Sequence, residues 1–502
     1  MTRRRGGFLL LLLTGLVSIS CRATPGEVRV GSKKFTESVV LGEIVTQLVG
    51  STGVRAEHRA QLGGTQVLWH ALLAREIDVY PEYTGTIRED ILPESSGDGS
   101  DESLRAELAR HGIGMTGSLG FENSYALGMS EAEALRLNAR QISDLRAYPG
   151  LRLGFSEEFL HRGDGWQSLR VRYRLPQTDV RQLDHDVAYR ALAAGDLDAT
   201  DLYTTDAEIP YYHLRVLVDD LHQFPSYRAV LLYRLDLVQR SPAVLTALGA
   251  LEGRITVEDM QRLNARVKLE RLPERDVAAD FLAAELRIER KATSEGRAPR
   301  IGRYVAQHLA LVLASLSAAI VAAIPIGIAA ARRRRLGAAI LALAGVVQTI
   351  PSLALLVFMI PLLGIGTAPA VAALFLYSVL PIVRNTVSGL TGISGSLLES
   401  ADVLGLSSAA RLWKVELPLA SPSILAGIQT SAVINVGTAT LGALIGAGGL
   451  GQPILTGIRL DNLGLILEGA IPAALLALMV QALFELLGRW LIPKGLRLRS
   501  DS

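Results

Sequence analysis

The stretch YVAQHLALVLASLSAAIVAAIPIGIAAARRRR, Tyr304–Arg335, decides the fold class of the second half of this chain. Its apolar part is longer than the ~20 residues that a helix needs to cross a lipid bilayer. Four consecutive arginines follow at once, and basic clusters of this kind stay on the cytoplasmic side of a membrane. The stretch therefore predicts a transmembrane helix whose C-terminal end is cytoplasmic and whose N-terminal end lies outside.

Further apolar runs follow this helix. Together they predict an all-α transmembrane domain of about five spans over residues 304–495, because five runs near the spanning length are too many for buried soluble helices. No Asp or Glu occurs from Ile301 to Leu398. The four later runs are Leu336–Leu363, which Pro351 interrupts, Ala368–Leu390, Ile424–Ile445 and Leu465–Ile492.

The half of the chain before this domain has the composition of a soluble protein. Strand-like segments such as Val28–Gly31 and Leu151–Phe155 alternate with helix-like ones such as Ser38–Val49. This alternation predicts an α/β domain of two lobes with largely parallel sheets over residues 22–290. A charged stretch without an apolar face then predicts a linker over residues 291–303.

The N-terminus is typical of an export signal, predicted over residues 1–21. Arg3, Arg4 and Arg5 precede the apolar stretch Phe8–Ile19, which is too short to span a bilayer. Cys21 follows small residues, as in bacterial lipoprotein signals, so we expect lipidation of Cys21. Ordinary cleavage nearby, with Cys21 discarded or inert, is the alternative. Export agrees with the topology that the arginines predict, and the chain is expected in the bacterial inner membrane.

Several function classes find no support in the sequence. The net charge is +2, which does not favour a nucleic-acid partner, and one cysteine excludes a disulfide within the chain. We expect no metal site, because the adjacent Asp184, His185 and Asp186 point in different directions and fit a surface turn better. No phosphate-binding loop is present, so the chain itself is expected to hold no cofactor.

The cytoplasmic loop after the third span carries a specific motif, ESADVLGLSSAARLWKVELPLA, residues 399–420. A short helix ends at a glycine, and Leu-Pro begins the return to the membrane. This loop resembles the ATPase-coupling loop of binding-protein-dependent ABC permeases. The resemblance implies a cytoplasmic ABC ATPase as partner, a permease homodimer in the lipid, and no catalysis by this chain. The residues that match the motif are Glu399, Ala401, Gly405, Leu417 and Pro418.

The soluble half resembles the quaternary-ammonium binding proteins of glycine betaine, choline and carnitine importers. The matching segments are GSKKFTES (31–38), IDVYPEYTGT (77–86), FENSYAL (121–127) and DLYTTD (201–206). The resemblance implies a two-lobed periplasmic-binding-protein fold of type II. A trimethylammonium group offers no N–H donor, and aromatic ring faces attract it at about 0.5–2 kcal/mol per contact.

The resemblance also assigns candidate ligand-binding residues. An aromatic box would hold the cation, and polar donors would hold a carboxylate, so that choline would leave buried cations unpaired. The box residues are Tyr83, Tyr125, Tyr203 and Tyr227, with Phe35 close by. The carboxylate donors are Lys33, Thr86 and Arg162, and Asn123 stands where some relatives carry Asp.

The sequence therefore predicts an importer subunit that combines solute capture with membrane permeation for glycine betaine or a related osmolyte. Choline, carnitine, ergothioneine or another small zwitterion stays open as the solute. An enzyme is not favoured, because neither a nucleophile elbow nor metal-ligand spacing is found. A secondary transporter would show intramembrane acids for ion coupling. A ligand sensor would need an output domain, and only a short tail follows the last span.

Overall fold

The computed structural model divides the chain into two compact units that meet between Ala292 and Thr293, inside the segment predicted as a linker. We call residues 27–288 the first unit and residues 296–491 the second unit, and describe each by itself. Cys21 and Arg162 lie outside the described residues. The residues that the structure describes are 27–93, 100–161, 163, 165–183, 185–288, 296–460 and 462–491.

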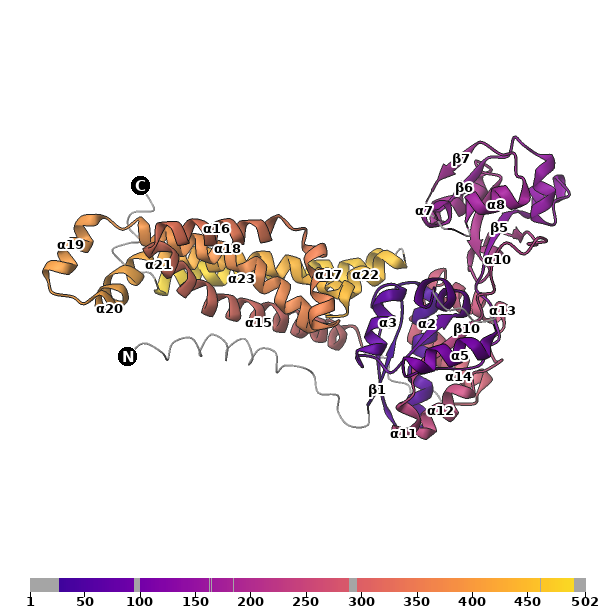
Figure 1. Ribbon diagram of the computed structural model, residues 1–502, viewed down its shortest axis with the longest axis horizontal. Helices are drawn as coiled ribbons and strands as arrows, with labels where there is room; N and C mark the ends of the chain where they lie inside the picture. The colour runs from indigo at the N-terminus through magenta and orange to yellow at the C-terminus, as the bar shows by residue number, and fades with distance from the viewer. Residues whose placement is uncertain are drawn as a thin grey trace. The chain divides into compact units, whose positions relative to one another are not determined.

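The first unit contains two five-stranded sheets, each the centre of one lobe (Figure 1). The first lobe has the strand order β2-β1-β3-β10-β4. The five strands are β1 (Glu27–Gly31), β2 (Arg55–Arg59), β3 (Val79–Tyr83), β4 (Ile113–Met115) and β10 (Ala229–Arg234). The helices of this lobe are α2 (Thr36–Ser51), α3 (Thr65–Leu73), α4 (Thr84–Thr86), the π-helix η1 (Ile87–Ile91), α5 (Asp101–Arg110), α11 (Leu237–Arg240), α12 (Pro242–Gly249), α13 (Val257–Lys268) and α14 (Glu274–Glu285).

The second lobe repeats this pattern with the strand order β7-β6-β8-β5-β9. Its strands are β5 (Tyr125–Ser130), β6 (Leu153–Phe155), β7 (Val180–Gln182), β8 (Ala199–Tyr203) and β9 (Leu214–Val216). Its helices are α6 (Glu131–Arg136), the 3-10 helix η2 (Ile142–Ala147), α7 (Glu157–His161), α8 (Trp166–Tyr173), α9 (His185–Ala194) and α10 (Glu208–Tyr211).

Both sheets are largely parallel, as predicted, because four of the five strands in each run in one direction. One strand in each sheet runs against its neighbours. β10 is antiparallel to β3 and β4, and β5 is antiparallel to β8 and β9. Each of these strands is the first that the chain forms after it crosses between the lobes. A crossing strand enters its new sheet from the side of the other lobe, which sets its direction.

The two crossing segments are hydrogen-bonded to each other and form the hinge between the lobes. The Asn123 N–H donates to the Tyr227 carbonyl at 3.0 Å, and the Ala229 N–H donates to the Phe121 carbonyl at 3.1 Å. Glu122 and Arg228 form an antiparallel bridge in the same region. Because β3, β8 and the crossing segments all reach this region, residues at their ends are close to the hinge.

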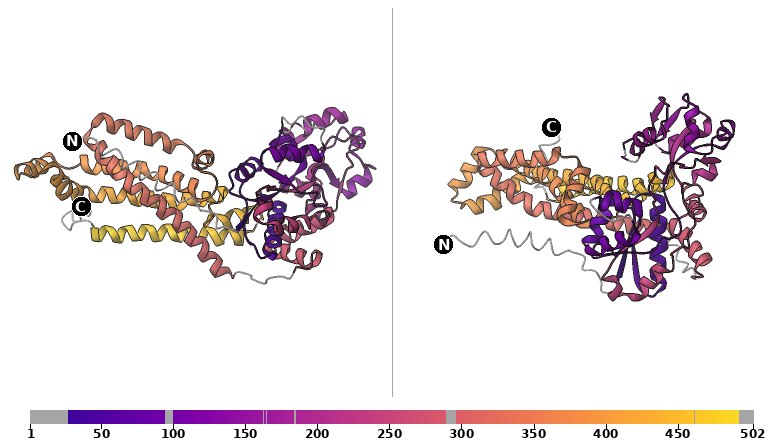
Figure 2. Two further views of the ribbon diagram at one scale, coloured as in Figure 1. Left: turned by 60° about the horizontal axis from the view of Figure 1, so that its bottom comes forward. Right: turned by 45° about the vertical axis from the view of Figure 1, so that its right-hand side comes forward.

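The second unit is helical, with long helices that run alongside one another (Figure 2). Among the described residues, four helices are long and apolar enough to cross a membrane, or five if a bent pair counts as one span. This confirms the prediction of an all-α domain of about five spans. The principal helices are α15 (Arg297–Arg332), α16 (Arg334–Thr349), α17 (Ser352–Leu363), α18 (Thr367–Thr391), α21 (Leu417–Thr438) with the 3-10 helix η4 (Ala439–Ile445), α22 (Gly451–Arg459) and α23 (Leu463–Leu491).

Two boundaries in the second unit differ from the sequence prediction. α15 begins at Arg297, so residues 297–303 of the predicted linker are helical; Pro299 is tolerated because it lies in the first turn. The predicted second span is two helices, α16 and α17, that meet at an angle of 99°. Pro351 lies at the break and cannot donate the backbone hydrogen bond that a continuous helix requires.

Candidate functional site

In the first lobe, Phe35 and Tyr83 form an aromatic pair at the edge of the sheet. Tyr83 ends β3, and Phe35 caps the N-terminus of α2. Their ring centroids are 6.3 Å apart with the planes inclined by 30°, so the rings are stacked. Tyr83 is 6% exposed, whereas Phe35 is 39% exposed.

Lys33 lies beside this pair, in a buried ion pair that the sequence did not reveal. Its Nζ is 2.5 Å from Oε1 of Glu82 and 3.0 Å from Oγ1 of Thr65, and 5.8 Å from the centroid of the Tyr83 ring. Burial raises the pKa of the Glu82 carboxyl, although the charge and hydrogen bond of Lys33 act to lower it. The ammonium charge of Lys33 is thus already compensated within the first lobe.

The second lobe contributes a larger aromatic group around Tyr125 and Tyr203. The two tyrosines are directly opposite in the pairing of β5 with β8, with ring centroids 4.7 Å apart and hydroxyl oxygens 2.8 Å apart. Phe159 and Phe224 pack against Tyr125 at centroid distances of 5.5 and 6.5 Å. These phenylalanines were not predicted as site residues; Phe159 is the third residue of α7, shortly after the end of β6.

His185 joins this group from α9 and is not part of a surface turn, so that interpretation of the sequence was wrong. Its Nε2 is 2.7 Å from Oδ2 of the buried Asp201, and its ring lies edge-on to Tyr203 at 5.2 Å. Burial acts to lower the pKa of His185, but the hydrogen bond and charge of Asp201 and the charge of Asp206 raise it overall. Burial and the neighbouring Glu208 raise the pKa of Asp206 to about 6.

Two more predicted residues, Tyr227 and Asn123, lie on the crossing segments of the hinge. Tyr227 is 5% exposed and its ring lies against Gly85, where an added Cβ would be 2.5 Å from the ring. Asn123 donates from Nδ2 to Oε1 of Glu37 at 3.0 Å. Thr86 is half-buried at the end of α4, one residue from Gly85. The structure thus brings the predicted site residues that it describes to the hinge and to the strand ends beside it.

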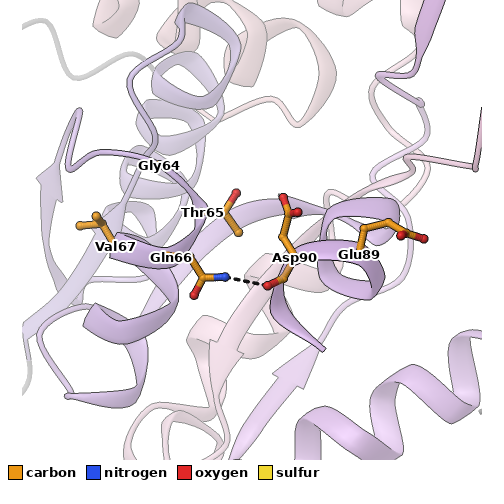
Figure 3. A pocket seen from close by; sticks show the side chains of 6 residues that line it. All are labelled: Gly64, Thr65, Gln66, Val67, Glu89 and Asp90. Carbon is orange, nitrogen blue, oxygen red and sulfur yellow. Dashed lines mark hydrogen bonds between the residues drawn. The ribbon is translucent and has the colours of Figure 1, made fainter. Parts of the chain in front are cut away.

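A hollow of about 440 Å³ lies nearby on the first lobe, but its chemistry differs from that of the predicted site (Figure 3). Gln66 donates from Nε2 to the Asp90 carbonyl across it at 2.6 Å. None of its lining residues is aromatic, so it offers no ring face to a trimethylammonium group. Its lining residues are Gly64, Thr65, Gln66, Val67, Glu89 and Asp90.

The second unit contains the other predicted site, the loop between α18 and α21. Its first helix, α19 (Gly395–Val403), is followed by Gly405 at φ +75°, a conformation that glycine adopts without strain. Glu399 is exposed on α19 and Ala401 is buried, whereas Leu417 and Pro418 begin α21. Between them lie α20 (Ser408–Arg411) and the π-helix η3 (Leu412–Glu416).

Ion pairs connect this loop to the helix ends behind it. Arg411 contacts both carboxylate oxygens of Asp402 on α19 at 2.7 Å and donates to Glu416 at 2.9 Å. Glu416 also accepts a bond of 3.4 Å from Arg332, at the end of α15. In the same loop Val403, Leu404 and Trp413 are 88%, 79% and 71% exposed, an apolar surface flanked by charges.

Comparison with known proteins identifies both units. The model of the "Substrate binding domain of ABC-type glycine betaine transport system" family matches residues 26–284. The model of the "Binding-protein-dependent transport system inner membrane component" family matches residues 323–495.

Individual relatives agree with these families. The glycine betaine/carnitine/choline transport system permease protein OpuCB of Bacillus subtilis is 43% identical over 191 residues, which are 38% of this chain and 88% of the relative. The osmoprotectant import permease protein OsmW of Salmonella typhimurium is 42% identical over 196 residues, 38% of this chain and 91% of the relative. A crystal structure titled as a glycine betaine/carnitine/choline ABC transporter aligns over 52% of this chain and 100% of its own, with 25% identity and a TM-score of 0.49. The two family matches and the two permease relatives show that the chain belongs to the family of substrate-binding domains of ABC-type glycine betaine transport systems, fused here to a binding-protein-dependent transport system inner membrane component.

Proposed function

We propose that this chain captures glycine betaine or a related quaternary-ammonium solute in its first unit and admits it through its second. The observation that carries the proposal is the pair of aromatic groups on the two lobes. Phe35 and Tyr83 stand at the edge of the first sheet, and Tyr125 and Tyr203 stand at the ends of strands of the second. Both groups lie at the side of their sheet that leads to the hinge.

The chemistry of these groups suits a methylated cation. A trimethylammonium group is attracted by ring faces at about 0.5–2 kcal/mol per contact and loses little by giving up its weak hydration. The exposed ring of Phe35 and the half-buried ring of Tyr203 are accessible for such contacts. Three or four rings would supply about 2–8 kcal/mol, and contacts to the carboxylate would have to add to this to reach the net of about 8 kcal/mol that micromolar affinity requires.

Choline is the second candidate, because the ion pair of Lys33 with Glu82 removes one reason to exclude it. Discrimination against choline was expected because a solute without a carboxylate would leave Lys33 unpaired. Since Glu82 compensates Lys33 already, that penalty does not arise from Lys33. Arg162 and Thr86 then carry the carboxylate contact that would make glycine betaine the better ligand.

The second unit supports import through contact with a separate ATPase. We propose that α19 and the exposed Val403, Leu404 and Trp413 dock on that subunit, because an apolar surface of this kind on a charged loop suits a protein partner. The arginines at the end of α15 favour a cytoplasmic location for this loop, and on the same ground we propose that the first unit lies outside. We further propose that two copies pair in the lipid to form the pathway.

A titration of the full chain in lipid nanodiscs tests the proposed solute. Glycine betaine and choline would be titrated into the unaltered chain and into Tyr83→Leu and Tyr203→Leu. We expect binding near micromolar and a loss of about 2- to 30-fold in each variant, the equivalent of one ring contact. Tyr211→Leu, an exposed tyrosine on α10, is the matched control. The proposal would be refuted if both site variants bound the solutes as well as the unaltered chain does. It would also be refuted if the unaltered chain bound neither glycine betaine nor choline.

A further inference from the structure

Glu37 is a buried carboxylate for which cation capture, as described above, gives no role. It lies in the first turn of α2 and is 3% exposed. The Tyr83 hydroxyl and the Asn123 amide donate to its Oε1, and the Asn264 amide donates to its Oε2 at 3.2 Å. These donors come from β3, from a crossing segment of the hinge, and from α13, so one carboxylate gathers three separate parts of the chain.

The same network reaches the second lobe directly after Tyr203. Asn264 donates from Nδ2 to the Thr205 carbonyl at 3.0 Å, and Gln261 on α13 donates to the Thr204 carbonyl at 2.9 Å. α13 packs against α2, so these bonds tie the segment that follows β8 to the first lobe. A continuous chain of hydrogen bonds therefore runs from Tyr83 through Glu37 and Asn264 to the residues beside Tyr203.

The composition of this network argues against a role in stability alone. Burial raises the pKa of Glu37, and the hydrogen bonds of Thr205, Tyr83, Asn264 and Asn123 oppose that rise without reversing it. A buried carboxylate whose named donors are all neutral lowers the free energy of unfolding, and an apolar residue would pack there at a smaller cost in stability. The carboxylate offers instead several acceptor positions in fixed directions, which lets it hold donors from different segments at once.

We infer that Glu37 is a positioning residue that sets the orientation of Tyr83 and the relative placement of the two aromatic groups across the hinge. It does not touch the solute. Its hydrogen bond holds the Tyr83 hydroxyl, and through Asn264 it restrains the segment after Tyr203. The inference deepens the proposed function, on which its consequence for affinity rests, but its consequence for the hinge does not require any solute.

The test uses the full chain in nanodiscs with Cys21→Ser and spin labels at Ala109→Cys on α5 and Val171→Cys on α8, both exposed. Pulsed electron resonance measures the distance between the lobes without any solute. We expect Glu37→Gln and Asn264→Ala to shift or broaden the distance distribution, and their combination to add little to either alone. Glu43→Gln is the matched control, because Glu43 lies on the same helix and is bonded to His58.

An unchanged distribution in folded Glu37→Gln, or additive effects of Glu37→Gln and Asn264→Ala, would overturn the inference. If Glu37→Gln does not fold, Asn264→Ala alone still decides, because it cuts the same chain of bonds. In a second measurement Glu37→Gln should weaken glycine betaine binding about tenfold, yet change it little when Tyr83→Phe is already present. Failure of the unaltered chain to bind any solute would refute the proposed function. The distance measurement would still test the positioning role of Glu37, because it uses no solute.

Discussion

Substitutions of Lys33 can distinguish a structural role of this residue from a role in ligand binding, because its ion pair with Glu82 is buried. The two side chains are 8% and 0% exposed, and the Nζ–Oε1 distance is 2.5 Å. We consider Lys33→Met alone and Lys33→Met combined with Glu82→Gln. The single change leaves Glu82 as a buried charge without its cation, whereas the double change removes both charges and keeps the side-chain volumes similar.

The expected magnitudes differ clearly between the two variants. Removal of one partner of a buried ion pair costs about 3–5 kcal/mol, whereas replacement of both is often neutral. In a domain of this size, about 1 kcal/mol moves the melting temperature by roughly 2–4 °C, so the single variant should lose about 6–20 °C.

The pH dependence of the single variant gives a second signature. Without Lys33, the folded-state pKa of Glu82 rises further above its unfolded value, so the folded form holds the proton more tightly. Stability is then greatest below the unfolded pKa and is lost as the pH rises through the folded pKa. The loss caused by Lys33→Met should therefore be smaller at pH 5 than at pH 8.

The assay is thermal unfolding of the full chain in detergent for the melting temperature, and urea unfolding for the free energy, both followed by tryptophan fluorescence. Trp69 in the first lobe and Trp166 in the second are 6% and 3% exposed and report the unfolding of their lobes. The double variant should regain most of the stability and keep its glycine betaine affinity within about threefold. Equal stability of both variants would refute the buried pair. A stable double variant that loses glycine betaine but not choline would show that Lys33 contacts the carboxylate after all.

Three further predictions follow from the ion pairs and packing. The folded-state pKa of Asp206 is about 6 against an ordinary value of 3.8, so the stability of the unaltered chain falls as the pH rises between these values. Asp206→Asn removes this titration and should therefore stabilise the first unit more at pH 7.5 than at pH 4, by on the order of 3 kcal/mol. The same difference in unfolding free energy between variant and unaltered chain at both pH values would contradict this. Arg411→Ala should reduce ATP-driven uptake in proteoliposomes severalfold while solute binding persists, because Asp402 loses the guanidinium that links α19 to the membrane helices; unaltered uptake would exclude that link. Gly85→Ala should destabilise the first unit by about 1–3 kcal/mol in thermal unfolding, because its Cβ would meet the Tyr227 ring, and an unchanged melting temperature would count against that packing.

The fold could be predicted well where the sequence carries a local pattern. Apolar runs determine the membrane helices, and Pro351 marks the break between α16 and α17, although its angle of 99° depends on how the two helices pack. The direction of β5 and β10 could not be predicted, because it follows from where the chain crosses between lobes. Nothing within residues 125–130 or 229–234 distinguishes an antiparallel strand from a parallel one.

The site could be predicted in its residue types but not in its pairings. Tyr83, Tyr125 and Tyr203 stand in segments that resemble quaternary-ammonium binding proteins, and the structure groups them at the hinge side of the sheets. The partner of Lys33 is 49 residues away in sequence, and only the adjacency of β1 and β3 brings Glu82 near it. The role of Glu37 depends on four segments at once, which no local pattern records.

The most direct test of the central claim compares glycine betaine with 3,3-dimethylbutanoate, its carbon isostere, in which the cationic nitrogen is replaced by carbon. The two have nearly the same shape and the same carboxylate, so only the positive charge on the methylated head differs. In calorimetric titration of the full chain, aromatic recognition of that charge predicts an affinity for glycine betaine at least about fivefold higher, from two or more ring contacts. Equal affinities would contradict it and show that the rings serve as an apolar surface alone.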